Sequence, residues 1–206
     1  MSASAALRRR PTMTLEEFLA WEERQEERWE FDGFAPVAMT GGTRAHSALG
    51  TALAAALVPR LRGGPCRYYG GDLKFVTASG TSRCPDGFVA CGPGGPRDTL
   101  ERDPVAVFEV LSASTARVDR TVKAREYRET PSLRRYVMLE QGRAAATVYA
   151  RDADDPARWS VTLLFEGDAL ALPEAGIEVP MAELYLGLDF GAPAAADATA
   201  ATAEAV

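Results

Sequence analysis

The chain has few of the residues that build common disulfide and zinc sites. Its 206 residues include three cysteines and a single histidine. Cys66, Cys84 and Cys91 are odd in number, and none of them forms a C-x-x-C pair. This pattern argues against a disulfide framework and against a zinc site. We therefore expect a reducing compartment, and the predicted location is the cytoplasm.

A long hydrophobic run is also missing, and basic residues are in the minority. The longest stretch of small apolar residues, around positions 48–58, is too short to span a bilayer, so no membrane association is expected. The 23 Lys and Arg against 29 Asp and Glu give a formal net charge of -6. Because non-specific nucleic-acid affinity comes largely from Lys and Arg, a DNA-binding role requires local basic patches.

The composition fits one ordinary globular domain. Hydrophobic residues make up 47% of the chain and charged residues 25%, enough for one full core. Residues 1–12 are expected to form a flexible leader and residues 13–190 the folded domain. Residues 191–206 are rich in alanine and are expected to be a disordered tail. No internal repeat is found.

Local patterns predict an alternation of helices and strands. Thr14 and Glu17 have the spacing of a capping box, which predicts a helix that begins at Leu15 and continues to about Arg28. Leucine recurs every fourth residue from 49 to 61, which predicts a second helix from about position 43. A third helix is predicted over 115–129. Strands are predicted over 29–39, 68–76, 87–91, 105–111, 135–139, 145–149 and 159–165.

These elements predict an α/β fold with a mixed β-sheet flanked by helices. The apolar run from Val105 to Phe108 indicates a central strand that is covered on both faces. Such a strand needs helices above and below it, and the predicted helices supply them. The sequence therefore favours a single layered domain.

Two acids and one amine are the candidate functional residues. Asp86 follows Pro85 just before one predicted strand, and Glu109 lies within the apolar central strand, where an unpaired carboxylate is costly to bury. Lys123 lies on the helix that follows. Mg²⁺ is commonly held by one or two carboxylates, so Asp86 and Glu109 suffice, with the main-chain oxygen of Val110 as a further candidate. Lys123 would supply a positive charge for an anionic substrate.

Four segments, in this order, resemble the Uma2 family of endonucleases within the PD-(D/E)XK nuclease superfamily. They are residues 28–33, 39–46, 84–86 and 109–127, and the resemblance covers about residues 14–189. It implies a restriction-endonuclease-like fold and cleavage of DNA phosphodiesters with Mg²⁺, or Mn²⁺ in its place. The superfamily places its lysine two residues after the second acid, where this chain has Leu111. The resemblance moves that role to Lys123, one of only two lysines in the chain.

The resemblance also implies supporting roles for Glu30 and His46. Glu30 matches the family's acidic residue at the end of the first helix, where it could hold the metal through water. His46, in the first turn of the second helix, could meet a phosphate or carry a proton. The sequence also leaves simpler readings open: Glu30 as a solvated glutamate and His46 as a structural residue.

Other simpler readings stay open as well. Asp86 could be a turn residue. Asp119 and Lys123 could form a surface ion pair worth about 0.2–0.5 kcal/mol. The predicted helix that carries Lys123 also carries four arginines that could contribute a basic patch or form a solvated face: Arg117, Arg120, Arg125 and Arg128.

The interpretation is a Mg²⁺-dependent endonuclease that acts on DNA. Asp86 and Glu109 are the expected metal ligands, and Lys123 is the expected cation of the site. A homodimer is expected because two sites are needed to cut both strands in a simple way. Two alternatives remain: a nucleic-acid- or partner-binding module that keeps the fold without cutting, and a metal-dependent hydrolase of a small phosphoester.

Overall fold

The structure of the protein is a computed structural model that describes residues 13–112, 115–188 and 190. The predicted leader (1–12) and tail (191–206) lie outside the described residues, so both stay predictions. Within the described part, none of the helices is both long enough and apolar enough to cross a membrane.

A six-stranded mixed sheet forms the centre of the fold, in the order β11-β10-β9-β8-β6-β3. Its strands are β3 (Cys66–Gly70), β6 (Gly87–Cys91), β8 (Pro104–Leu111), β9 (Arg135–Glu140), β10 (Ala145–Arg151) and β11 (Trp159–Phe165). Strand β8 pairs parallel with β9 and antiparallel with β6. Every residue of β8 except Val105 is buried, which confirms the predicted central strand.

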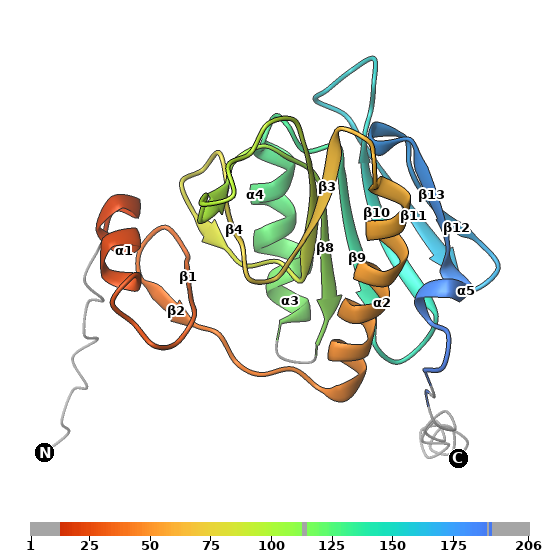
Figure 1. Cartoon of the computed structure of the whole chain (residues 1–206), viewed down its shortest axis with the longest axis horizontal. Helices are drawn as coiled ribbons and strands as arrows, with labels where there is room; N and C mark the ends of the chain where they lie inside the picture. The colour runs from red at the N-terminus through yellow and green to blue at the C-terminus, as the bar shows by residue number, and fades with distance from the viewer. Residues whose placement is uncertain (1–12, 113–114, 189, 191–206) are drawn as a thin grey trace, which may run out of the picture.

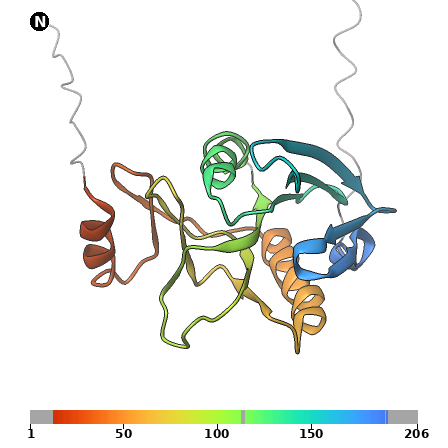
Figure 2. The ribbon, with the colours of Figure 1, turned by 90° about the horizontal axis from the view of Figure 1, so that it is seen from above.

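Helices cover both faces of this sheet, which confirms the predicted α/β fold with flanking helices (Figure 1). Helix α2 (Arg44–Leu61) packs Leu49, Leu53 and Leu57 against one face, in the same apolar cluster as Phe108. The four-residue leucine spacing therefore marks the buried side of α2. Figure 2 shows α2 on one side of the sheet and the helical segment of α3 (Ala116–Val118) and α4 (Ala124–Glu129) on the other.

A second, five-stranded sheet lies beside the first and carries the N-terminal residues. Its order is β2 (Pro36–Ala38), β1 (Trp29–Phe31), β5 (Ser82–Arg83), β4 (Lys74–Val76) and β7 (Leu100–Glu101). Helix α1 (Leu15–Glu22) precedes it and has the predicted capping box between Thr14 and Glu17. This helix ends well before Arg28, because tight turns at Trp21 and Glu22 close it.

Two predicted strands are each broken into two. The predicted strand 29–39 is a hairpin of β1 and β2, because Asp32 Oδ1 accepts hydrogen bonds from the N–H groups of Phe34 and Ala35, and Gly33 has a φ of 89°. The predicted strand 68–76 stops at Gly70, and its second part, β4, joins the smaller sheet.

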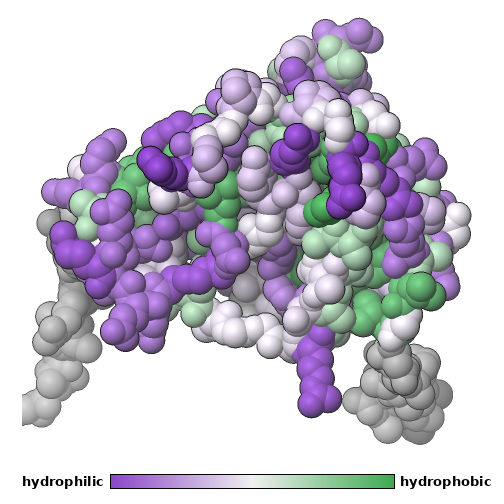
Figure 3. Space-filling model, in the orientation of Figure 1, coloured by the Kyte–Doolittle hydropathy of each residue, from purple (hydrophilic) through white to green (hydrophobic). Residues whose placement is uncertain are grey.

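The C-terminal elements were not predicted. Strands β12 (Ala169–Leu172) and β13 (Ile177–Pro180) form a hairpin around η2 (Pro173–Ala175), and α5 (Met181–Leu184) follows. They add Leu172, Val179 and Met181 to the apolar cluster that contains α2. Figure 3 shows a mostly hydrophilic surface over α1 and the β1–β2 hairpin, and more apolar surface near α5.

Cys66 and Cys91 form a disulfide, so the expectation of no disulfide is wrong. The two cysteines are register partners on the antiparallel strands β3 and β6, a relation that cysteine spacing alone does not reveal. Cys84 is buried and remains a free thiol.

Replacing both bridged cysteines (C66A/C91A) is expected to lower the free energy of unfolding by about 3 kcal/mol. The bridge closes a loop with a sequence separation of 25 residues, so its loss gives the unfolded chain more freedom. Urea unfolding of the wild type and the variant would measure the difference. An unchanged unfolding midpoint would show that the bridge contributes no stability.

Candidate functional site

Glu109 is the centre of the candidate site. It lies on β8 with its side chain toward α4, and only 4% of its surface is exposed. Its Oε1 accepts a hydrogen bond from Lys123 Nζ at 3.0 Å and another from the Tyr127 hydroxyl at 2.9 Å. The buried carboxylate is therefore held from the helix that follows, as the sequence order of Glu109 and Lys123 predicts. Sequence analysis included Tyr127 in the resemblance but gave it no role in the site.

Lys123 lies on η1 (Asp119–Lys123), a π-helical turn between α3 and α4. Its ammonium lies 3.0 Å from Glu109 Oε1, 3.2 Å from Glu30 Oε1 and 3.3 Å from Asp119 Oδ1. Burial opposes the charged form, but these three carboxylates outweigh it and raise the pKa of Lys123. The amine is therefore a fixed positive charge at neutral pH. Such π-helical turns are frequent at functional sites.

Asp86 lies beside Glu109 at the end of the β6–β8 ladder. Gly87 pairs with Phe108, so the neighbouring residues Asp86 and Glu109 meet where the ladder ends. Asp86 Oδ2 accepts the main-chain N–H of Val110 at 2.6 Å. The strand geometry therefore brings together the two acids that were predicted as metal ligands.

His46 lies near the start of α2, as predicted, and faces Asp86. Its Nε2 is 3.2 Å from Asp86 Oδ1. The hydrogen bond to Asp86 raises the pKa of His46 despite partial burial, and the charges of Asp86 and Asp119 add to the effect. His46 is thus a proton-carrying group in contact with one predicted metal ligand.

Glu30 reaches the site from the smaller sheet. It lies on β1 and not at the end of the first helix, because α1 ends at Glu22. Its Oε1 accepts the Cys84 N–H at 3.0 Å and lies beside the Lys123 ammonium. Burial would raise the pKa of Glu30, but Lys123 and Arg83 lower it overall. Its side chain is 12% exposed, so the solvated reading is wrong.

Asp119 is a buried acid of the site, for which sequence analysis left a surface ion pair open as the simpler reading. Only 1% of it is exposed, so the reading of a surface ion pair with Lys123 is wrong. Neither carboxylate oxygen has a hydrogen-bond partner among the described residues. The spacing of Asp119 and Lys123 was the available signal, but the burial depends on the π-helical turn.

The site holds more acids than bases. Four carboxylates influence one another around a single ammonium: Glu30, Asp86, Glu109 and Asp119. Burial raises the pKa of Glu109, Lys123 opposes this, and the other acids add to it, so that the pKa rises to about 8. The arrangement favours either protonation of Glu109 or an added positive charge.

A divalent cation fits this donor set. The excess of hard oxygen donors matches what Mg²⁺ binds, and Asp119 adds two buried oxygens that accept no hydrogen bond from the described residues, although Oδ1 faces the Lys123 ammonium. In the described ranges, no group of three or more His, Cys, Asp and Glu side chains is arranged as a ready metal-binding cluster. Mg²⁺ often takes only one or two protein carboxylates and completes its shell with water and substrate oxygens, so Asp86 and Glu109 fit the role.

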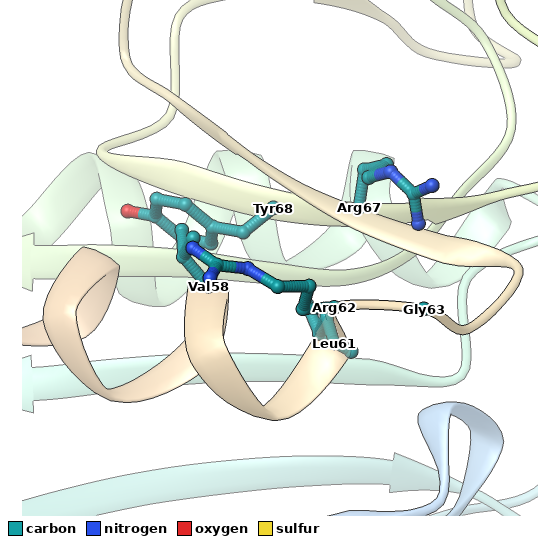
Figure 4. Close-up of a pocket in the computed structure, with 6 residues that line it drawn as sticks. All are labelled: Val58, Leu61, Arg62, Gly63, Arg67 and Tyr68. Atoms are coloured by element: carbon teal, nitrogen blue, oxygen red, sulfur yellow. The ribbon is translucent and has the colours of Figure 1, made fainter.

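A pocket of about 200 Å³ lies at the C-terminal end of α2, and none of the four acids lines it (Figure 4). Its lining residues are Val58, Leu61, Arg62, Gly63, Arg67 and Tyr68. In Figure 4 the Tyr68 hydroxyl and the Arg67 guanidinium point in opposite directions. That hydroxyl donates to the main-chain oxygen of Asp86 at 3.4 Å, so Tyr68 is the contact between the pocket wall and the acid cluster.

The arginines of the third helical segment supply only part of a basic patch. Arg120 pairs with Glu140 at 2.7 Å, and the Arg128 guanidinium lies over the Tyr149 ring. Arg117 and Arg125 are exposed. Two of the four predicted arginines are therefore already engaged within the chain.

Comparisons with known proteins agree with this architecture. A family model described as "Uma2: Putative restriction endonuclease" matches residues 15–182. The "Uncharacterized protein slr1290" of Synechocystis is 32% identical over 182 residues, which are 87% of this chain and 95% of that protein. A crystal structure of "a putative nuclease belonging to DUF820" from Anabaena variabilis shares the fold. Its TM-score is 0.64 at 16% identity, over 84% of this chain and 97% of that chain. Because the family model spans most of the sequence, the chain belongs to the Uma2 family.

Proposed function

We propose that this chain is an endonuclease that hydrolyses phosphodiester bonds of DNA with Mg²⁺, or with Mn²⁺ in its place. The observation that carries the proposal is the buried contact between Glu109 and Lys123, 3.0 Å long, beside Asp86. Charged groups are costly to bury, and clusters with perturbed pKa values are typical of functional sites. Membership of a family described as restriction endonucleases supports the same reaction class.

Each residue has a role that follows from its contacts. Asp86 and Glu109 hold the cation, which when bound polarises a phosphoryl oxygen and lowers the pKa of a water. Lys123 stabilises the negative charge that develops on the phosphate as the bond breaks. His46, paired with Asp86, carries a proton at its Nε2. Glu30 holds the Lys123 ammonium in place.

A second candidate is a catalytically inactive module that binds nucleic acid or a protein partner. Two observations favour it: the described residues contain no ready cluster of three metal ligands, and the net charge is -6. A panel of plasmid, single-stranded DNA, RNA and small phosphoesters separates these activities. The homodimer is part of the proposal because two sites cut both strands of a duplex.

Divalent-cation binding is the first test, and Asp86→Ala is the variant. We expect the wild type to bind Mn²⁺ and D86A to bind it at least about tenfold more weakly, because a carboxylate ligand is lost. Isothermal titration calorimetry measures both affinities. Asp86→Asn keeps an acceptor for the Val110 N–H and should lose affinity as well.

Asp72→Ala is the matched control for this measurement. Asp72 is fully exposed and pairs with Arg28 outside the acid cluster, so D72A should bind Mn²⁺ like the wild type. A wild type without Mn²⁺ affinity, or a D86A variant with unchanged affinity, would favour the inactive module.

A further inference from the structure

A buried arginine, Arg83, connects the smaller sheet to helix α4 next to the candidate site. It lies on β5, and 3% of its surface is exposed. Its Nε and Nη2 donate to the two carboxylate oxygens of Glu126 at 2.8 and 2.7 Å. Its Nη1 donates to Glu30 Oε2 at 3.2 Å. One guanidinium therefore binds the buried Glu126 and the partly buried Glu30 at once.

These contacts require the shape of arginine. The planar guanidinium presents several donors in a rigid fork, so one face can bind Glu126 at two points while another nitrogen reaches Glu30. A lysine ammonium is a point charge and cannot hold both carboxylates in this way. Glu126 lies on α4, the helix that follows Lys123, so the fork also ties β5 to the segment that carries the amine.

Glu30 is fixed at both of its oxygens. Arg83 binds Oε2, and the Cys84 N–H binds Oε1, which also faces the Lys123 ammonium at 3.2 Å. The carboxylate therefore cannot rotate without breaking a buried contact, which is costly. Lys123 in turn contacts Glu109, so an unbroken series of contacts runs from Glu126 through Arg83 and Glu30 to the centre of the site.

We infer that Arg83 is a positioning residue of the site: through Glu30 it fixes where the Lys123 ammonium lies. The inference rests on the proposed function for its catalytic consequence, but the positioning itself is a property of the folded chain. Arg83 is outside the acid–amine contact itself, because its hydrogen bonds go to Glu126 and Glu30.

The test uses a double substitution because Arg83 and Glu126 neutralise each other. Removing Arg83 alone leaves a buried, unpaired carboxylate at Glu126, and such a change is strongly destabilising. Replacing both by methionine (R83M/E126M) removes the charge pair together, which is often tolerated. This variant still lacks the contact that holds Glu30. R83K serves as the second variant, since it keeps the charge beside Glu126 but loses the fork.

NMR of the lysine ammonium groups reports the environment of Lys123 and its exchange with water. The chain has two lysines, Lys74 and Lys123, so ¹⁵N-lysine labelling gives two ammonium signals at most, and K74R identifies the one from Lys123. In the wild type we expect a Lys123 signal protected from exchange with water, because the ammonium is buried among three carboxylates. In R83M/E126M the signal is expected to be lost, and in R83K to shift.

A matched control is the Arg60–Glu183 pair, which joins α2 to α5 by two hydrogen bonds of 2.8 and 2.6 Å away from the site. R60M/E183M should leave the Lys123 signal unchanged. If Arg83 has only a structural role, R83M/E126M should also leave the Lys123 signal unchanged.

Cleavage kinetics give the second reading. R83M/E126M should lower kcat by about tenfold or more with KM within about twofold, because a misplaced charge affects the reaction step more than substrate binding. If no variant or wild type cleaves DNA, the proposed function fails while the NMR result still decides the positioning. If R83M/E126M does not fold, R83K decides in the same way. A Lys123 signal unchanged in position and protection in whichever of the two variants folds would overturn the inference.

Discussion

Lys123→Ala is expected to lower the rate of DNA cleavage by about a hundredfold or more. Among the residues that the structure describes, the Lys123 ammonium is the one positive charge in direct contact with Glu109. In the proposed reaction it stabilises the phosphate on which negative charge accumulates. Removing one such electrostatic stabiliser typically costs a factor of about 10²–10³. Single-turnover cleavage of a plasmid at saturating Mg²⁺ measures the loss, and a rate within about threefold of the wild type would remove Lys123 from the mechanism.

The same substitution should also destabilise the fold, which sequence analysis did not anticipate. Three carboxylates depend on this ammonium, and two of them, Glu109 and Asp119, are almost completely buried. Leaving a buried charge unpaired costs about 3–5 kcal/mol. Urea unfolding in the absence of metal should show this loss for K123A. Lys74→Ala is the control, because Lys74 pairs with Glu22 outside the site.

Several elements could be predicted because their signals are local. The capping box at Thr14 and the leucine spacing of α2 each depend on residues within one helix, and both predictions are confirmed. Strand β8 could be predicted because its apolar run before Glu109 is continuous and uncharged. From these elements the layered α/β fold followed.

Long-range contacts could not be predicted in the same way. The Cys66–Cys91 bridge depends on the pairing of β3 with β6, and the β1–β2 hairpin depends on side-chain hydrogen bonds at Asp32. Strands β12 and β13 have only four residues each, too few for a clear periodic pattern, so their fit against α2 is visible only in the folded chain.

In the candidate site, too, some features could be predicted from local sequence and others could not. Acids beside apolar strands indicated that Asp86 and Glu109 would lie near each other, and the structure brings them together with Lys123. Their roles in metal binding and cleavage stay predictions. The π-helical turn that buries Asp119 has no simple sequence signature. Arg83 was missed because a single arginine in a two-residue strand carries no periodic pattern.

Glu109→Gln is expected to lower cleavage by about a hundredfold while the fold is kept. Glutamine has the shape of glutamate and retains an oxygen that can accept from Lys123 and Tyr127, which both donate to Oε1. It lacks the negative charge that a divalent cation needs. E109Q therefore separates the charge of this residue from its packing. Glu140→Gln, at the end of the neighbouring strand β9, is the control and should cleave normally.

The pH dependence of stability gives an independent check on the same variant. In metal-free wild type, the pKa of Glu109 is raised from 4.5 to about 8, chiefly by burial. Between these two pH values the folded chain keeps a proton on Glu109 that the unfolded chain has released. The contribution of Glu109 to the free energy of unfolding is therefore fully present below about pH 4.5 and is lost as the pH rises to about 8. E109Q cannot titrate, so its stability should fall less over this range. Urea unfolding in EDTA at several pH values measures both slopes, and equal slopes would mean that Glu109 is ionised throughout, held by Lys123 without any need for a metal.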